Sequence, residues 1–284
     1  MGLLSGLESF GLGKYKNAKV LKEEAQATQK DGEAKKVKTP KLTEEDCIYD
    51  KHYICPICDS SFTSKCVRAG KLKLAGKDMD LRPRYEVMDP LKYDVITCDK
   101  CGYSSLTRYY GKLTTRQMMD IRDEIGSHFS GLDNSSTIFS YEDAIFRFKL
   151  ALVCAIVKNA KNSERGYLCL KMSWLYRGLR ESDTVHDEEK LKQLQSEELE
   201  CMETAYDSFS AALSKEPLPI AGMDENTVKY ILAELARRLK KYEEAGKLVS
   251  SVIVSRQVSD RLKDQALTLR EQIKAEMKSE SVEQ

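Results

Sequence analysis

Cys55-Pro-Ile-Cys58 and Cys98-Asp-Lys-Cys101-Gly102 decide the fold of the N-terminal half of this 284-residue chain. Two residues between paired cysteines allow a tight turn to aim both thiolates at one ion, while backbone N–H groups of the turn hydrogen-bond the sulfurs. Gly102 suits the positive φ that such a turn requires. Two turns supply four thiolates in a tetrahedron. The spacing therefore predicts a closed four-cysteine metal site formed by Cys55, Cys58, Cys98 and Cys101.

The metal expected in this site is a structural zinc ion, because a small segment poor in apolar residues is not stable enough to fold without a bound metal. Iron in a rubredoxin-like site uses the same four thiolates and stays open as an alternative. The 39 residues between Cys58 and Cys98 exceed the spacing of a compact four-cysteine site, which predicts an elaborated hairpin or insertion there. Cys47, His52 and Cys66 lie near the first motif and are alternative ligands or redox partners.

Composition and charge exclude several classes of protein. The chain has 46 Lys and Arg residues and 45 Asp and Glu residues. With 41% apolar and 32% charged residues, its composition fits neither a bundle of membrane helices nor a disordered or collagen-like chain. The longest apolar run, Leu150 to Val157, is far below the roughly 20 residues that span a bilayer. The N-terminus lacks the pattern of a signal peptide, and Gly6 replaces the Ser or Thr of a myristoylation signal. We therefore expect a cytoplasmic protein with no membrane partner and with reduced cysteines.

Shifts in composition divide the chain into five segments. The first is rich in Lys, Glu and Ala and is expected to be flexible, the second holds six cysteines and short alternating stretches, and the fourth has helical periodicity throughout. The predicted segments are a flexible arm at 1–45, a zinc-ribbon-like metal-binding domain at 46–112, a connecting helix and turn at 113–139, a helical domain at 140–278, and a disordered tail at 279–284.

The helical domain contains six amphipathic helices in series, each marked by apolar residues three or four apart. Ser140 with Asp143 has the pattern of an N-cap, Asp224 can cap another helix, and Ser259 can start the last. A further helix is expected from Thr115 in the connecting segment. The predicted fold class is α+β, mainly α, with a small β domain followed by a helical-hairpin array.

One helical pair resembles the middle of a tetratricopeptide repeat (TPR), in which small residues allow two helices to approach closely. Leu232, Ala233, Tyr242 and Ala245 fit the repeat positions, whereas Ala236 stands where an aromatic residue is usual. The prediction is a TPR-like array, with a plain helical bundle as the alternative.

Several motifs together resemble an uncharacterised bacterial family, domain of unknown function 2225. They are GLESFGLGKY at 6–15, the first cysteine pair with Phe62, Asp78-Met-Asp80, the second pair with Tyr103, LKMSWLYR at 170–177 and YILAELARRLKKYEEA at 230–245. Ser104-Ser105 departs from the small apolar residue expected after the second pair. The resemblance implies a zinc-ribbon-like cysteine region joined to TPR-like helices, a metal, and no particular activity.

Other signals are weaker. Gly70 to Asp78 lacks the spacing and the Ser or Thr of a phosphate-binding loop, and the chain contains none of the common hydrolase or dinucleotide motifs. Cys154, Cys169 and Cys201 fall within helical patterns and are expected to pack in the core. We therefore expect a non-enzymatic protein-interaction adaptor with an unknown protein or peptide partner.

Two other functions stay open. The first is nucleic-acid binding through the basic hairpin Lys65–Lys77. It is not favoured, because residues 46–115 contain 12 basic and 9 acidic residues. A divalent ion held by four thiolates would lower the net charge of this segment by about two more. The second is a thiol-based redox sensor.

Overall fold

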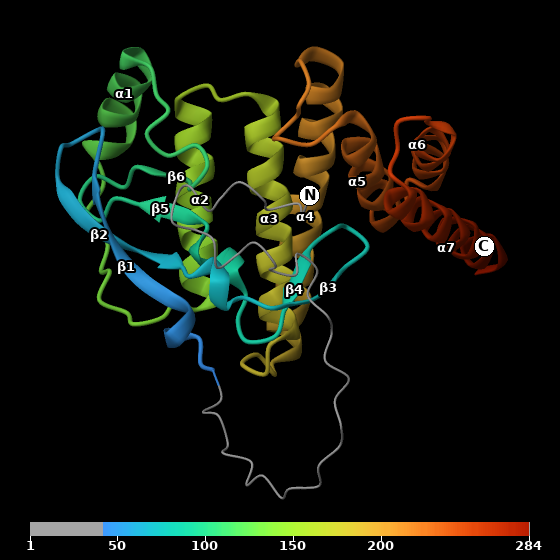
Figure 1. Cartoon of the computed structure of the whole chain (residues 1–284), viewed down its shortest axis with the longest axis horizontal. Coiled ribbons are helices and arrows are strands. Elements are labelled where there is room, and N and C mark those ends of the chain that lie inside the picture. Colours follow the sequence, from blue (N-terminus) through green and yellow to red (C-terminus); the bar gives the residue numbers. More distant parts are fainter. Residues whose placement is uncertain (1–41, 284) are drawn as a thin grey trace, which may run out of the picture. The chain divides into compact units, whose positions relative to one another are not determined.

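The computed structural model describes residues 42–283 (Figure 1). The predicted arm at 1–45 falls outside the described residues up to position 41. The helices are α1 Thr115–Ile121, α2 Tyr141–Val157, α3 Asn162–Glu181, α4 Glu188–Lys215, α5 Glu225–Arg238, α6 Tyr242–Val254 and α7 Asp260–Glu283. The strands are β1 Ile48–Ile54, β2 Ser61–Val67, β3 Leu74–Lys77, β4 Pro83–Tyr85, β5 Val95–Thr97 and β6 Ser104–Leu106. The predicted α+β, mainly α class is confirmed.

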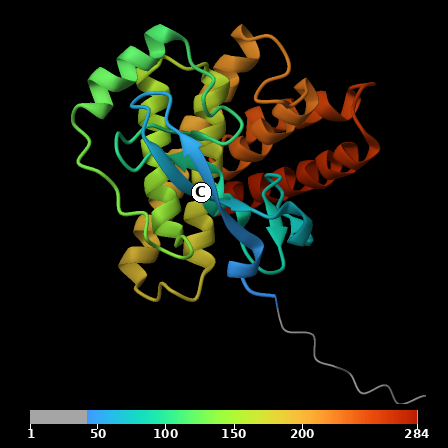
Figure 2. The same cartoon turned by 60° about the vertical axis from the view of Figure 1, so that its left-hand side comes forward.

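The strands form three separate antiparallel hairpins, β1–β2, β3–β4 and β5–β6. The long segment between the two cysteine pairs holds β2, the β3–β4 hairpin, a short 3-10 turn at Pro90–Tyr93 and β5. It is therefore the elaborated insertion that the spacing predicts. Figure 2 shows the β1–β2 ribbon in front of helices α2 and α3.

Side-chain caps fix where the helices begin. The Ser140 hydroxyl accepts a hydrogen bond from the Asp143 N–H, and the Asp143 carboxylate accepts one from the Ser140 N–H, which makes a complete capping box at α2. Asp224 accepts a 2.8 Å bond from the Thr227 N–H at α5. Both predicted starts are confirmed, and each cap satisfies N–H groups that the first turn of a helix leaves unpaired.

The apolar core consists of several clusters of buried side chains that extend from the hairpins to the last helix. Helices α2 and α3 pack on each other, α2 also packs on β5–β6, α3 packs on α4, α4 packs on α5, and α5 packs on α6 and α7. Leu232, Ala233 and Ala245 are fully or almost fully buried in the α3–α7 region, as helices in close contact require. Helix α7 extends to Glu283, into the segment for which the sequence predicts a tail. The TPR-like character of the helices stays a prediction.

A buried ionic cluster connects the loop between β3 and β4 to the helices. Asp80 is 0% exposed and accepts a 3.0 Å hydrogen bond from the Trp174 indole N–H. The Arg177 guanidinium lies 2.7 Å from the Asp80 carboxylate and donates a 2.7 Å bond to Glu198 of α4. Arg238 of α5 donates to the fully buried Glu234 at 2.7 Å. The loop is thus held to α3, and through it to α4, by paired buried charges.

None of the helices among residues 42–283 has the length and apolar content that crossing a bilayer would require.

Candidate metal centre

The two cysteine pairs sit at the tips of the hairpins β1–β2 and β5–β6 and have the same backbone geometry. The Cys55 N–H donates to the Ser60 carbonyl at 3.0 Å, and the Cys98 N–H donates to the Tyr103 carbonyl at 2.9 Å. In each turn the residue after the second cysteine donates back to the first cysteine's carbonyl at 3.0 Å. Each hairpin therefore closes the tight turn that the Cys-x-x-Cys spacing predicts.

The residue after each second cysteine has a positive φ, 56° at Asp59 and 72° at Gly102. Aspartate tolerates this left-handed region better than most residues, whereas glycine enters it without strain. Gly102 has a second reason to lack a side chain, because a Cβ there would lie 2.7 Å from the ring of Phe129. The predicted role of Gly102 in the turn is confirmed, and the close approach of Phe129 is added by the tertiary structure.

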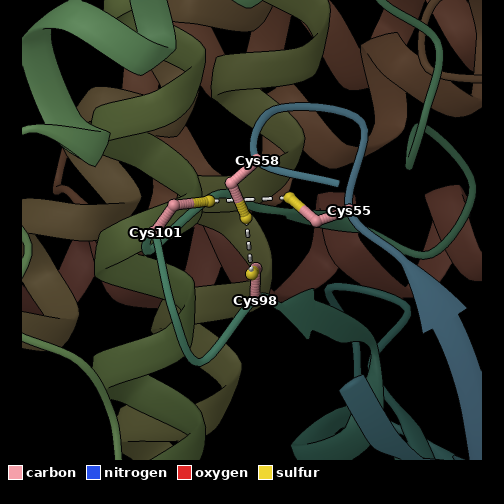
Figure 3. A group of neighbouring side chains, drawn as sticks. All are labelled: Cys55, Cys58, Cys98 and Cys101. Atoms are coloured by element: carbon pink, nitrogen blue, oxygen red, sulfur yellow. Dashed lines mark hydrogen bonds between the residues drawn. The ribbon is translucent and has the colours of Figure 1, made fainter. Parts of the chain in front are cut away.

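The two turns face each other and bring the four cysteine sulfurs together (Figure 3). All four Sγ atoms lie within 4.8 Å of one another. Between the turns, Cys55 Sγ is 3.5 Å from Cys101 Sγ, and Cys58 Sγ is 3.7 Å from Cys98 Sγ. A tetrahedral ion with metal–sulfur bonds of about 2.3 Å requires sulfurs roughly 3.8 Å apart. The donor set and its spacing therefore fit a four-coordinate metal ion.

The electrostatics of the cluster also favour a cation. Hydrogen bonds from the Cys101 and Cys55 thiols, together with the N–H groups of Cys101 and Lys100, lower the pKa of Cys98 well below its usual range. Hydrogen bonding to Cys55 and Cys98, together with burial, raises the pKa of Cys101 far above its usual value. Four thiolates this close repel one another, so all four can lose their protons only when a cation offsets the charge. The Ile57 N–H also donates to Cys55 Sγ, at 3.4 Å.

A shell of residues from other segments holds the cluster in place. Arg122 lies in a π-helical turn at Arg122–Gly126 that continues α1, and its guanidinium donates two hydrogen bonds to the Ile57 carbonyl, at 2.6 and 3.0 Å. Cys154 of α2 accepts a 3.3 Å bond from the Ser104 N–H. Burial raises the pKa of Cys154 to about 11, so it remains a neutral thiol. The apolar part of the shell consists of Ile57, Phe62, Ile96, Tyr103, Ile121 and Ile125.

Sequence reasoning missed Arg122 as a residue that supports the first turn. No motif marks it, since a lone arginine 64 positions after Cys58 has no spacing signal, and only the fold brings it to Ile57. Cys154 was predicted to be a core residue and is 1% exposed, which confirms the burial. Cys169 is buried and Cys201 is partly buried, both among apolar side chains.

The three alternative ligands lie outside the four-sulfur group found among residues 42–283. Cys47 is fully buried in a separate apolar cluster with Tyr93 and Phe139. His52 is exposed on β1, opposite Thr63. Cys66 Sγ lies 3.2 Å from the Tyr53 hydroxyl. The structure therefore gathers only the two Cys-x-x-Cys pairs in the part of the chain that it describes.

The predicted basic hairpin is partly neutralised by its neighbours. Lys65 pairs with Asp50 at 2.9 Å, and Lys73 pairs with Glu86 at 2.7 Å. The Arg68 guanidinium lies 5.0 Å from the centre of the Tyr49 ring. A nucleic-acid-binding hairpin needs lysines free to contact phosphates, and two lysines of the segment are already paired.

Comparison with known proteins gives a family but no relative of established activity. No curated protein and no solved structure matches the chain. Residues 48–273 match the family described as "Uncharacterized protein conserved in bacteria (DUF2225)", and this match covers most of the chain, including all four cysteines of the cluster. The chain therefore belongs to this bacterial family.

Proposed function

We propose that this chain is a non-enzymatic cytoplasmic protein in which one structural zinc ion fixes the two cysteine hairpins and the helices bind a protein partner. The observation that supports the metal is the group of four thiols within 4.8 Å of one another. Zinc with four thiolates is typical of sites that hold small hairpins together.

The surroundings of the cluster support a structural role for the ion. Cys55 and Cys98 are 0% exposed and Cys101 is 5% exposed, and apolar side chains surround them. A catalytic zinc ion keeps one coordination position for water or substrate, whereas four cysteines fill a tetrahedron. We propose zinc rather than iron because a redox-inert ion is sufficient for a site whose role is to stabilise the fold.

Metal analysis of the purified full chain tests the identity of the ion. We expect about one zinc ion per chain and no visible absorption. Chelation under denaturing conditions should release it. A stoichiometric iron content with the visible absorption of an iron–thiolate site would overturn the zinc assignment, and a protein purified with almost no bound metal of any kind would overturn the structural role.

The proposed interaction surface is the outer face of α2. Phe146, Val153 and Ile156 are 46%, 46% and 54% exposed. Together with exposed Glu142 and Lys149 they follow a spacing of four and three residues, which is the spacing of one helix face that meets another helix. Exposed apolar side chains gathered on one face mark interaction sites more often than isolated ones do. We propose that an amphipathic helix of a partner protein packs there, with an acidic residue opposite Lys149.

Affinity purification from the native host with matched baits tests this surface. The full chain is compared with the variant Phe146→Glu/Ile156→Glu and with Val254→Glu, since Val254 is 78% exposed at the end of α6. We expect a partner that the native chain and the Val254 variant retain and that the α2 variant loses about tenfold or more, because charged residues are depleted from the core of an interface. Equal recovery by all three baits, or recovery of no protein above background, would contradict the proposal.

A further inference from the structure

A second region with the geometry of a binding site lies between the hairpins and helices α3 and α5. It is a cleft of about 880 Å3, within the range of roughly 300–1,000 Å3 that small-molecule sites occupy. Its walls come from the β1–β2 and β3–β4 hairpins, the turn at Pro90–Tyr93, and helices α3 and α5. The four clustered cysteines do not line it. The cleft therefore needs an explanation of its own.

Two rows of side chains line this cleft, and each consists of one lysine and two aromatic residues. On β1, Tyr49, Lys51 and Tyr53 are two residues apart and therefore share one face of the strand. On α3, Tyr167, Lys171 and Trp174 are four and three residues apart and share one face of the helix. Each row places a lysine between two aromatic rings. The strand thus offers the rings of Tyr49 and Tyr53 to the cleft and the helix offers the ring of Tyr167, with Trp174 buried at its base.

The charges in the cleft are not balanced. Four cationic side chains line it against two anionic ones. Lys171 is paired with Asp94, and Arg82 donates to Asp89 at 3.1 Å. The remaining cations are the exposed Lys51 and Lys77, which lie more than 4 Å from every carboxylate in the described part of the chain.

Lys51 has an aromatic neighbour but no anionic one among the described residues. Its ammonium group lies 5.1 Å from the centre of the Tyr53 ring. Lys77 ends strand β3, opposite Pro83. Lys51 and Lys77 can therefore bind an anion without breaking an existing ion pair. The net positive charge of the cleft comes from these two lysines.

We propose that this cleft binds a small planar organic anion. The accessible rings of Tyr49, Tyr53 and Tyr167 would stack on a planar body above the buried Trp174, and the lysines would bind its carboxylate, sulfonate or phosphate group. Tyrosine and tryptophan lose little conformational entropy on binding, which suits them to line such a site. This proposal concerns residues outside the cysteine cluster and a ligand distinct from the metal and from the partner of α2.

The single tryptophan of the chain, Trp174, lines the cleft and provides a site-specific signal. The test uses the full chain and the fluorescent aromatic sulfonate 8-anilinonaphthalene-1-sulfonate, with the uncharged N-phenyl-1-naphthylamine as its neutral counterpart. We expect one sulfonate to bind per chain, with energy transfer from Trp174 to the probe. In Lys51→Gln/Lys77→Gln the sulfonate should bind about tenfold more weakly, while the affinity for the neutral probe changes less than about twofold.

The matched control is Lys112→Gln/Lys247→Gln, which removes the same charge from two exposed lysines that do not line the cleft. It should bind the sulfonate as the native chain does. Thermal unfolding of all three proteins checks that they are equally folded, and we expect equal unfolding temperatures. The proposal is overturned if the two double variants bind the sulfonate equally well, or if the sulfonate binds without energy transfer from Trp174 or not at all.

Discussion

The variant Cys98→Ser should lose its metal and the ordered structure of both cysteine hairpins. Structural zinc contributes apparent binding free energies of about 10–16 kcal/mol in small peptides, and a domain is stable by only about 5–15 kcal/mol. Losing even a third of that contribution, about 3–5 kcal/mol, is therefore a large effect. Cys98 shares its apolar cluster with Ile121 of α1 and Cys154 of α2. We expect the disorder to extend to α1 and to the turn of α2 beside the cluster.

The last three helices should survive this change, because their core contains none of the clustered cysteines. Hydrogen exchange measured by mass spectrometry would show rapid exchange in the hairpins and retained protection in α5–α7. The control is Cys66→Ser, which removes a cysteine from strand β2 that lies outside the four-sulfur group. If Cys98→Ser and Cys66→Ser retained the same metal content and the same unfolding temperature, the cluster would have no structural role.

The variant Asp80→Asn should lower the free energy of unfolding by about 3 kcal/mol, the low end of the range for removing one member of a buried ion pair. The Arg177 guanidinium, which is 4% exposed, loses the charge of its fully buried partner Asp80 but keeps Glu198 at 2.7 Å. Asparagine is close in size to aspartate, so the change removes charge with little effect on volume. The loop between β3 and β4 should loosen from α3.

Urea unfolding followed by Trp174 fluorescence measures this effect directly, because the Trp174 indole donates to Asp80. The emission maximum of the folded variant should also shift when the acceptor loses its charge. The control is Asp50→Asn, where a carboxylate with 60% exposure pairs with Lys65 and the expected loss is below about 1 kcal/mol. A loss at Asp80 no greater than that at Asp50 would show that the buried cluster does not stabilise the fold.

The same interaction predicts how stability depends on pH. Burial alone would raise the pKa of Asp80, but the Arg177 and Arg238 guanidinium groups lower it below its ordinary value of 3.8. A carboxyl with a lower pKa in the folded state contributes its full stabilisation above pH 3.8 and loses it as the pH falls through the folded value. The stability difference between the native chain and Asp80→Asn should therefore shrink in acid. A difference that stays constant from neutral pH down to about pH 2 would contradict this assignment.

Local chemistry in the sequence predicted the parts of the fold that depend on residues close together in the chain. The Cys-x-x-Cys spacing predicted both turns, since two intervening residues permit few backbone paths. The capping residues Ser140 and Asp224 predicted two helix starts, because a cap bonds to an N–H only three residues away. Apolar periodicity predicted six helices after residue 140, and all six are present among the described residues.

The tertiary structure alone decided what lies between segments far apart in the chain. The contacts of Arg122 with Ile57 and of Asp80 with Arg177 join residues 65 and 97 positions apart. The cleft likewise combines a row on β1 with a row on α3. The sequence shows the residue spacing that places each row on one face of its strand or helix. It does not show how the strand and the helix pack so that both rows line the same cleft. Periodicity is a property of one segment, whereas the pairing of charges and surfaces depends on how all the segments pack together.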